Sequence, residues 1–256
     1  MSNKNKISIS NDNLLVAIEK AIKDNSSLSV IRKGDGENVI IGFNTVKGIK
    51  LIKYIRKLRH FNIRRFDIKF QKYFKRKLIK SFIEADYLGI AKDYSYSSIR
   101  KFDSEITAYY NLDNKKLVDS HFHLEFVKNP NNNNLINPIA QRLISNKKIG
   151  IISHLNISKF LKHHNSDIVA QFSIPKRDAG LFNKMTTKKF KEIVNSISNV
   201  KEKIDVWYLA AGAYAKPFSN HIKKENGIAI DIGSAIDTWA GEYHSRKYLR
   251  ELKEKN

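Results

Sequence analysis

The stretch DVWYLAAGAYAKPFSNHIKKENGIAIDIGSAIDTWAGE, residues 205–242, decides the fold. Its short apolar run at residues 206–211 is typical of a strand buried on both faces. Residues 213–225 have the apolar periodicity and the C-terminal cations of a helix, and an Asn-Gly pair follows as a stop signal. Residues 227–232 form a second apolar run. The stretch therefore predicts a parallel strand–helix–strand unit.

Glycines and charged residues stand where the two predicted strands end. A parallel unit of this kind binds ligands at the carboxyl ends of its strands, which places Gly212, Lys216, Asp231 and Gly233 near one crevice. The glycine after the first strand can adopt backbone angles that are closed to other residues and lets a ligand approach. The alternative is a purely structural unit, because a single glycine after a strand is a weak signal.

A second motif, RKGDGE at residues 32–37, follows a short predicted strand at residues 28–31. Two carboxylates one residue apart on a glycine-rich turn suit a hard divalent cation, Mg²⁺ or Mn²⁺, held together with a phosphate. The arginine on the same loop can pair with a phosphate or orient a carboxylate. The alternative is a β-hairpin that pairs residues 29–32 with 38–42, since Asp-Gly is a favoured hairpin turn. The candidate binding residues are Arg32, Gly34, Asp35, Gly36 and Glu37.

Predicted strands and helices alternate along the second half of the chain, which favours a doubly wound sheet. We expect a first helix at residues 11–25, capped by Asn11 or Asp12. The fold class is therefore α/β, with a doubly wound and mostly parallel sheet flanked by helices, and 256 residues suffice for one large domain or two small ones. The asparagine-rich run at 129–134 is a surface loop and the candidate seam of the chain. Further strands are expected at 85–91, 148–153 and 167–173, and helices at 138–145, 156–164 and 186–200.

Two histidines and a glutamate alternate within residues 117–127. If this segment is a strand, His121, His123 and Glu125 share one face, as a metal site requires. If it is a helix, only the first and the last share a face. The alternative is that these residues line a cleft or form hydrogen bonds in the core.

The composition narrows the class of protein. The 47 lysines and arginines exceed the 25 acidic residues by 22 charges, which favours nucleic acid, anionic lipid or phosphorylated small molecules as partners. A surface enriched in lysine and asparagine by an AT-rich genome is the alternative. The absence of cysteine excludes disulfides and thiolate metal sites. Without a signal peptide or a long apolar run, we expect a soluble, cytoplasmic protein that is at most peripheral to a membrane.

The basic charge is concentrated at residues 47–80, where fourteen lysines and arginines face one aspartate. Basic amphipathic helices suit a membrane surface or a nucleic-acid backbone. The alternative is a pair of core-packed helices with a solvated outer face. Aromatic residues interleaved with the cations would serve a nucleic-acid-binding protein, but most recur at helical spacing, which favours the core. These aromatics are Tyr54, Phe61, Phe66, Phe70, Tyr73 and Phe74.

The two motifs together resemble those of the GT-D-fold glycosyltransferases of bacterial surface-glycan pathways. That family has an Arg-x-Gly-Asp-Gly-Glu motif after an early strand, and the same pattern stands here at residues 32–37. It also has a late glycine turn, a helix with an early lysine and a strand that ends Asp-Ile-Gly. Here these are Gly212, Lys216 and Asp231–Gly233, followed by AIDTW at 235–239. A Pro-containing loop at 174–175 also fits. The resemblance covers residues 28–242, with Ser234 where the family often has histidine.

The resemblance implies a single Rossmann-like glycosyltransferase domain of GT-D type over residues 1–256. It implies a nucleoside-diphosphate sugar as donor, with a UDP-sugar as the first expectation, and Mn²⁺ or Mg²⁺ held by Asp35 and Glu37. It implies that Gly212 and Lys216 line the donor cleft, with the lysine facing phosphate, and that Asp231 and Gly233 close it. Because transfer also requires a base for the acceptor hydroxyl, we expect Asp237 to be catalytic together with the Asp35 and Glu37 pair. Asp178, Glu242 and His123 are the other candidates for the base.

The expected acceptor is a glycan or a lipid-diphosphate-linked glycan. The basic helices at 47–80 would then hold the enzyme on the anionic inner face of a membrane, and we expect no nucleic-acid partner. Two rival interpretations remain open: a nucleic-acid-binding or nucleic-acid-modifying α/β protein, and a scaffold without catalytic activity that docks a polysaccharide assembly on a membrane.

Overall fold

The computed structural model of the chain describes residues 8–91, 97–175 and 184–254, with the backbone alone for residues 97–101. Seven strands form one sheet in the order β3-β2-β1-β7-β6-β4-β5, and every neighbouring pair is parallel. The α/β class and the doubly wound parallel sheet are confirmed. The strands are β1 (Leu28–Arg32), β2 (Tyr87–Ile90), β3 (Lys116–Asp119), β4 (Lys148–Ile152), β5 (Asp167–Phe172), β6 (Val206–Leu209) and β7 (Ile228–Asp231).

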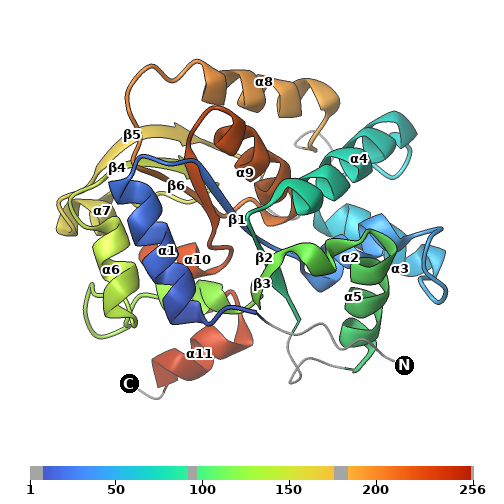
Figure 1. Cartoon of the computed structure of the whole chain (residues 1–256), viewed down its shortest axis with the longest axis horizontal. Helices are drawn as coiled ribbons and strands as arrows, with labels where there is room; N and C mark the ends of the chain where they lie inside the picture. Colours follow the sequence, from blue (N-terminus) through green and yellow to red (C-terminus); the bar gives the residue numbers. More distant parts are fainter. Residues whose placement is uncertain (1–7, 92–96, 176–183, 255–256) are drawn as a thin grey trace.

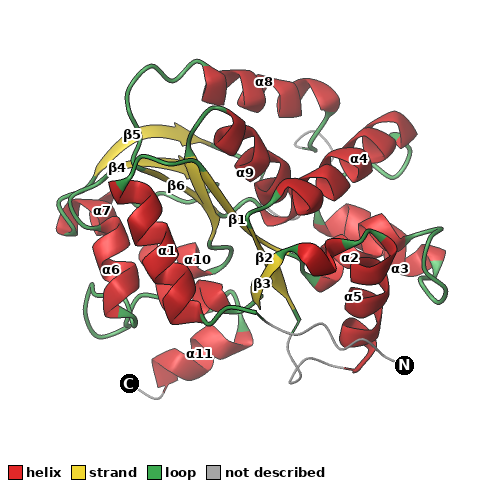
Figure 2. Ribbon diagram, in the orientation of Figure 1, coloured by secondary structure: helices red, strands yellow, loops and turns green. Residues whose placement is uncertain are grey.

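Helices cover both faces of the sheet (Figures 1 and 2). One face packs against α1 (Asn11–Lys23), α6 (Pro138–Ile144), α7 (Ser158–His163), α10 (Ala235–Trp239) and α11 (Lys247–Glu254). The other face packs against α2 (Asp35–Gly42), α3 (Leu51–His60), α4 (Ile68–Glu84), α5 (Ser97–Tyr109), α8 (Thr187–Ser198) and α9 (Ala215–Lys224). None of the described helices combines the length and the apolar character that a bilayer span requires.

Alternation along the buried strands divides the core into these two layers. In β6, Tyr208 belongs to the core on the α1 side, whereas Trp207 and Leu209 belong to the core on the α9 side. The hydroxyl of the buried Tyr208 donates to the carbonyl of Leu143 at 2.8 Å, so that burial does not leave it without a partner.

The connections that follow β1 and β7 leave in opposite directions. After β1 the chain enters α2 on one face of the sheet, and after β7 it enters α10 on the other face. The two strands are neighbours, so their divergent loops open a crevice at the carboxyl edge of the sheet. Arg32 and Asp231 end these two strands and stand at that crevice.

Two sequence-based interpretations of local structure are corrected. The hairpin alternative for residues 29–42 is wrong, because β1 pairs in parallel with β2 and β7 while residues 35–42 form α2. Gly34 caps this helix, and the two acidic residues in its first turn favour its N-terminus. The 117–127 segment is neither one strand nor one α-helix: β3 ends at Asp119 and a 3₁₀ helix, η2 (Phe122–Phe126), follows. The cap of α1 is Ser10, one residue earlier than expected.

Candidate functional site

Two adjoining cavities occupy the crevice. The first pocket, of about 480 Å³, lies between the end of β1, the N-terminus of α2, the end of β3 and α9. The second pocket, of about 300 Å³, lies toward the loop after β5 and α10. Both share the lining residues Arg32, His60, Phe61, Gly212, Ser234 and Arg246, so the two form one bipartite site.

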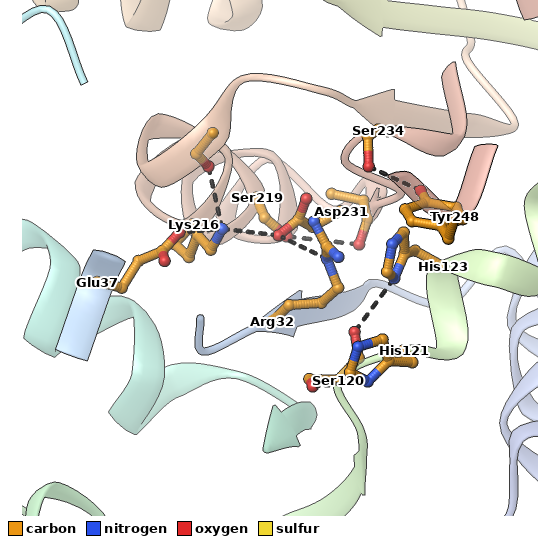
Figure 3. Close-up of polar contacts among 12 residues, drawn as sticks. Arg32, Glu37, Ser120, His121, His123, Lys216, Ser219, Asp231, Ser234 and Tyr248 are labelled. Carbon is orange, nitrogen blue, oxygen red and sulfur yellow. Dashed lines mark hydrogen bonds and ion pairs between the residues drawn. The ribbon is translucent and has the colours of Figure 1, made fainter. Parts of the chain in front are cut away.

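A buried cluster of four charges, named here the charge cluster, lies beside the first pocket (Figure 3). Lys216 of α9 places its Nζ atom 2.6 Å from Glu37 Oε1 and 2.9 Å from Asp231 Oδ2. It also donates to the carbonyl of Gly212 at 3.0 Å. Arg32 Nε lies 3.6 Å from Asp231 Oδ2. Both motifs predicted from the sequence therefore meet in one set of ion pairs.

Burial and the neighbouring charges act in opposite directions on Lys216 and Asp231 of the charge cluster. Burial alone would lower the pKa of Lys216, but Asp231 and Glu37 beside it outweigh burial and raise that pKa above its usual value. Burial would raise the pKa of Asp231, but Lys216 and Arg32 outweigh it and hold that pKa below its usual range. Lys216 and Asp231 therefore remain charged although both are buried.

Arg32 is the cation of the cluster that a ligand can reach. The three ammonium hydrogens of Lys216 match its three acceptors, and only 3% of its side chain is exposed. The side chain of Arg32 is 20% exposed and lines both pockets. Its buried Nε has no hydrogen-bond partner among the described residues. Lys216 therefore fixes the geometry, while Arg32 presents its guanidinium to the cavity together with the exposed Arg246.

Two predicted glycines make room for the site. Gly233 has φ of +47°, and a methyl group at its Cα would overlap the guanidinium of Arg32. Gly36 faces the ring of Phe61, which a methyl group would also meet. Gly212, with φ of +54°, begins the short 3₁₀ turn η4 (Gly212–Tyr214) that leads into α9. The sequence-predicted residues Arg32, Gly34, Asp35, Gly36, Glu37, Gly212 and Lys216 all line the first pocket.

Both carboxylates predicted to bind a metal are engaged in ion pairs in this structure. Asp35 Oδ2 lies 2.6 Å from Lys57 Nζ, and Glu37 is held by Lys216. Over the ranges that the structure describes, no three His, Asp or Glu side chains gather closely enough to hold an ion. Lys216 engages Oε1 of Glu37, so a bound cation would have to use the other carboxylate oxygen or replace the lysine. The same observation removes the metal alternative for His121, His123 and Glu125, since Glu125 instead accepts from Asn11 and Asn137.

A second polar group borders the first pocket at the end of β3. His121 Nδ1 lies 3.3 Å from Asp119 Oδ1, and the adjacent His123 is buried. Burial, together with Arg32 and His121, lowers the pKa of His123 well below its usual value, so this imidazole is neutral at pH 7. The hydroxyl of Ser234, which also lines this pocket, lies 2.9 Å from the hydroxyl of Tyr248.

Asp237 lines the second pocket rather than the first. Burial raises the pKa of Asp237 above its usual value, although the hydroxyl of Ser245 donates to its carboxylate. Glu242 lines the same pocket and is exposed, whereas Asp178 lies outside the described residues. The carboxylate with the raised pKa therefore lines the second pocket, whereas Lys216 and Glu37 of the charge cluster line the first.

Sequence reasoning missed several residues of the site. His60 and Phe61 reach it from the end of α3, and Arg246 reaches it from the segment before α11, which the sequence indicates only as a charged tail. Asp119 and Ser120 also escaped notice, although a charged residue at the end of a predicted strand is the signal that identified Asp231.

Comparisons with known proteins agree with this arrangement. A family model described as a GT-D fold-like domain matches residues 9–239. A solved structure described as "A New Glycosyltransferase (DUF1792) from Streptococcus sanguinis" superposes with a TM-score of 0.58 at 13% identity, over 98% of this chain and 88% of that one. Another, described as "The highly conserved domain of unknown function 1792 has a distinct glycosyltransferase fold", gives a TM-score of 0.57 at 13% identity, over 98% and 91%. No curated protein sequence matches the chain. The predicted resemblance, the fold and the glycosyltransferase class are confirmed at the level of the family.

Proposed function

Because the chain belongs to the GT-D fold-like family, we propose that it transfers a sugar from a nucleoside diphosphate to a hydroxyl group of a glycan or a lipid-diphosphate-linked glycan. UDP is the first expectation for the nucleotide, and assembly of a bacterial surface polysaccharide or glycoprotein is the expected setting. The observation that carries the proposal is the charge cluster at the carboxyl edge of the sheet, where it supports an arginine that faces a bipartite cavity.

The first pocket suits the donor diphosphate. Arg32 and Arg246 line it, and so does the N-terminus of α2 at Gly34–Gly36, where unpaired backbone amides attract anions. When the bond between the sugar and the diphosphate breaks, negative charge grows on the departing oxygen. Fixed cations in a site with little water stabilise that charge without reorganising. Glu37 and Asp231 hold the local charge balanced before the donor arrives, through Lys216 and Arg32.

The second pocket suits the acceptor, and Asp237 is its base. As the acceptor oxygen bonds to the sugar, its proton passes to the Asp237 carboxylate. The raised pKa of Asp237 makes it a stronger base than an ordinary aspartate. Since both pockets share Arg32 and Gly212, donor and acceptor would meet at the boundary between them.

The requirement for Mn²⁺ or Mg²⁺ stays a prediction, and no step proposed here passes through a metal. Asp35 is the carboxylate that a cation arriving with a diphosphate would meet first, because its side chain is 53% exposed against 8% for Glu37. Cytoplasmic location also stays a prediction.

A thermal-shift screen of UDP, GDP, CMP and dTDP sugars, with Mn²⁺ and with EDTA, tests the donor. A ligand that binds the folded state raises the melting temperature by mass action. We expect a shift with one nucleotide, and the EDTA arm decides whether a cation contributes. Folded protein that shifts with none of these donors, and transfers none of their sugars, would contradict the proposed function.

Asp237→Asn tests the base. We expect transfer to fall by about 10²–10⁴, while the shift with the donor is unchanged. Glu242→Gln is the matched control, because Glu242 lines the same pocket but is exposed. If the glutamate variant loses transfer and the aspartate variant keeps it, the two roles are reversed.

A further inference from the structure

An apolar patch is exposed on the basic helices. Of the large hydrophobic side chains that are exposed in the described chain, five lie within residues 51–68. The sequence favours a core position for Phe66, but the structure exposes 80% of it, while Phe70 and Phe74 are buried as expected. We name this patch the α3–α4 face. It consists of Leu51, Ile52, Ile55, Phe66 and Ile68.

The α3–α4 face surrounds a groove with an apolar floor. The groove has a volume of about 630 Å³ and is bordered by Leu51, Ile55, Phe66 and Ile68. Deeper in the groove lie Ile40, Phe43, Tyr54 and Leu58. Monomeric proteins rarely leave contiguous apolar surface of this kind in water unless it serves an interaction.

Cations surround the face, and they form no ion pair with an acidic side chain among the described residues. Asp67 accepts the backbone hydrogen of Phe70 as the cap of α4, so its carboxylate belongs to the helix end. Arg65 and Lys72 border the groove directly, and Arg65 lies over the ring of Phe66, 4.4 Å from its centroid. The exposed cations of this region are Arg56, Arg59, Arg64, Arg65, Lys69 and Lys72.

We propose that the α3–α4 face docks the protein on an anionic membrane leaflet, with the apolar side chains entering the headgroup boundary and the cations meeting lipid phosphates. Each lysine or arginine near such a surface contributes about 1 kcal/mol, and buried apolar area adds to it. A nucleic-acid backbone would satisfy the cations but would leave the aliphatic side chains Leu51, Ile52 and Ile68 in water, which is why the lipid surface fits better.

Docking by this face has a consequence for the site. The helix that carries Leu51 and Ile52 at its start ends at His60, and His60 and Phe61 line both pockets. Membrane docking through α3 thus connects the bilayer surface to the wall of the cavity. This last step rests on the proposed function, because it suits an acceptor linked to a lipid diphosphate; the docking itself does not.

Vesicle flotation tests the inference without donor or acceptor, so its result is independent of the proposed reaction. The full chain is mixed with vesicles of phosphatidylcholine alone or with 30% phosphatidylglycerol. We expect binding at least about tenfold tighter to the anionic vesicles, weakened by salt. The triple variant Leu51→Ser, Ile52→Ser, Phe66→Ser should lose at least about tenfold of it. The matched control replaces exposed apolar residues elsewhere: Val16→Ser, Tyr109→Ser and Ile136→Ser.

Two further variants separate charge from insertion. Lys69→Glu with Lys72→Glu should weaken anionic binding more than Lys188→Glu with Lys191→Glu on α8, where the lysines are equally exposed. Phe66→Trp should report a blue-shifted emission on binding, since the native Trp207 and Trp239 are buried. No binding by the wild type, or equal losses in test and control variants, would overturn the inference. Unchanged vesicle binding by the serine variant, with salt-dependent binding of DNA or RNA, would instead identify a phosphate-polymer surface.

Discussion

Two buried lysines, Lys33 and Lys216, show how the same side chain supports structure in one place and a site in another. Lys33 Nζ lies 2.8 Å from the single carboxylate of Asp103 and also donates to the Asp103 carbonyl and to Thr107. Burial lowers the pKa of Lys33, because one carboxylate does not outweigh it. Lys216 stands between two carboxylates, and its pKa is raised despite burial.

The two lysines differ in the further contacts that their carboxylate partners make. Asp103 also accepts from Asn38 and from the backbone of Ala91, so the Lys33 pair ties β1, α2 and β2 to α5 inside the core. The carboxylates around Lys216 instead connect to Arg32, which opens into the pockets. Arg32 ends β1 and Lys33 follows it, so adjacent residues belong to the two networks.

Lys216→Met should have the largest effect. It leaves Glu37 and Asp231 buried without their shared cation, so we expect a loss of about 3–5 kcal/mol in the free energy of unfolding. Transfer should fall by about 10²–10³, because Lys216 no longer holds Asp231, the carboxylate that Arg32 faces. Adding Glu37→Gln and Asp231→Asn removes the uncompensated charge and should restore stability but not transfer. Denaturant unfolding and a transfer assay on both proteins check this. Transfer restored in the triple variant would make the charge cluster purely structural.

Lys33→Met should match that loss of stability, by about 3–5 kcal/mol, because it leaves Asp103 uncompensated. The double variant with Asp103→Asn should recover most of it. Here the contrast with Lys216 is in activity: we expect the refolded double variant to transfer sugar at near the wild-type rate. A double variant that is stable but inactive would place the Lys33 network in the reaction.

Gly233→Ala tests the role of Arg32 and should have a smaller effect than the lysine variants. The methyl group would displace the guanidinium, and we expect the KM for the donor to rise by about tenfold. Gly241→Ala is the control, because Gly241 also has positive φ, at +80°, but nothing lies within 4 Å of its added methyl. Both variants carry backbone strain, so only the difference between them reports on Arg32. Equal donor kinetics in the two would show that displacement of the guanidinium has no effect.

The smallest effect is expected in alkaline solution, where the contributions of the two lysines to the free energy of unfolding should change in opposite directions with pH. An unfolded lysine holds its proton up to about pH 10.4. The folded pKa of Lys33 is lower, so the unfolded state binds more protons below pH 10.4, and the contribution of Lys33 to the free energy of unfolding rises with pH. The folded pKa of Lys216 is higher, so its contribution is constant until pH exceeds 10.4 and then falls. Unfolding of the wild type and each methionine variant at pH 8, 10 and 11.5 measures this: the Lys33 contribution should rise from pH 8 to 10 and the Lys216 contribution should fall from pH 10 to 11.5. Equal pH dependence of the two contributions would contradict the prediction.

The sequence predicts the strand–helix–strand unit well because its signals are local. Buried apolar runs, a glycine turn and an Asn-Gly stop bound each element, and β6, α9 and β7 appear within a few residues of their expected limits. The structure of residues 32–42 is harder to predict from local sequence. Asp-Gly suits both a hairpin turn and the first turn of a helix, and the choice is made by the distant strands β2 and β7 that pair with β1.

The site was predicted as a set of residues but not as a set of bonds. We expect Glu37 to bind a divalent metal ion, and in the structure it forms an ion pair with Lys216, which is distant in sequence. Nothing local indicates that the two motifs neutralise each other. The burial of Lys33 was not predicted for a related reason. Its partner Asp103 lies on α5, far along the sequence, and a lysine next to a pocket motif is expected to be exposed.

The order of the sheet also determines when the site can exist during synthesis. β1 lies between β2, its near neighbour in sequence, and β7, which forms close to the end of the chain. A ribosome releases the arginine and glutamate of the charge cluster long before the lysine and aspartate that neutralise them. Closing this longest-range strand pairing is therefore a late and slow event in folding. The charge cluster is therefore incomplete in the nascent chain until β7 has left the ribosome and paired with β1.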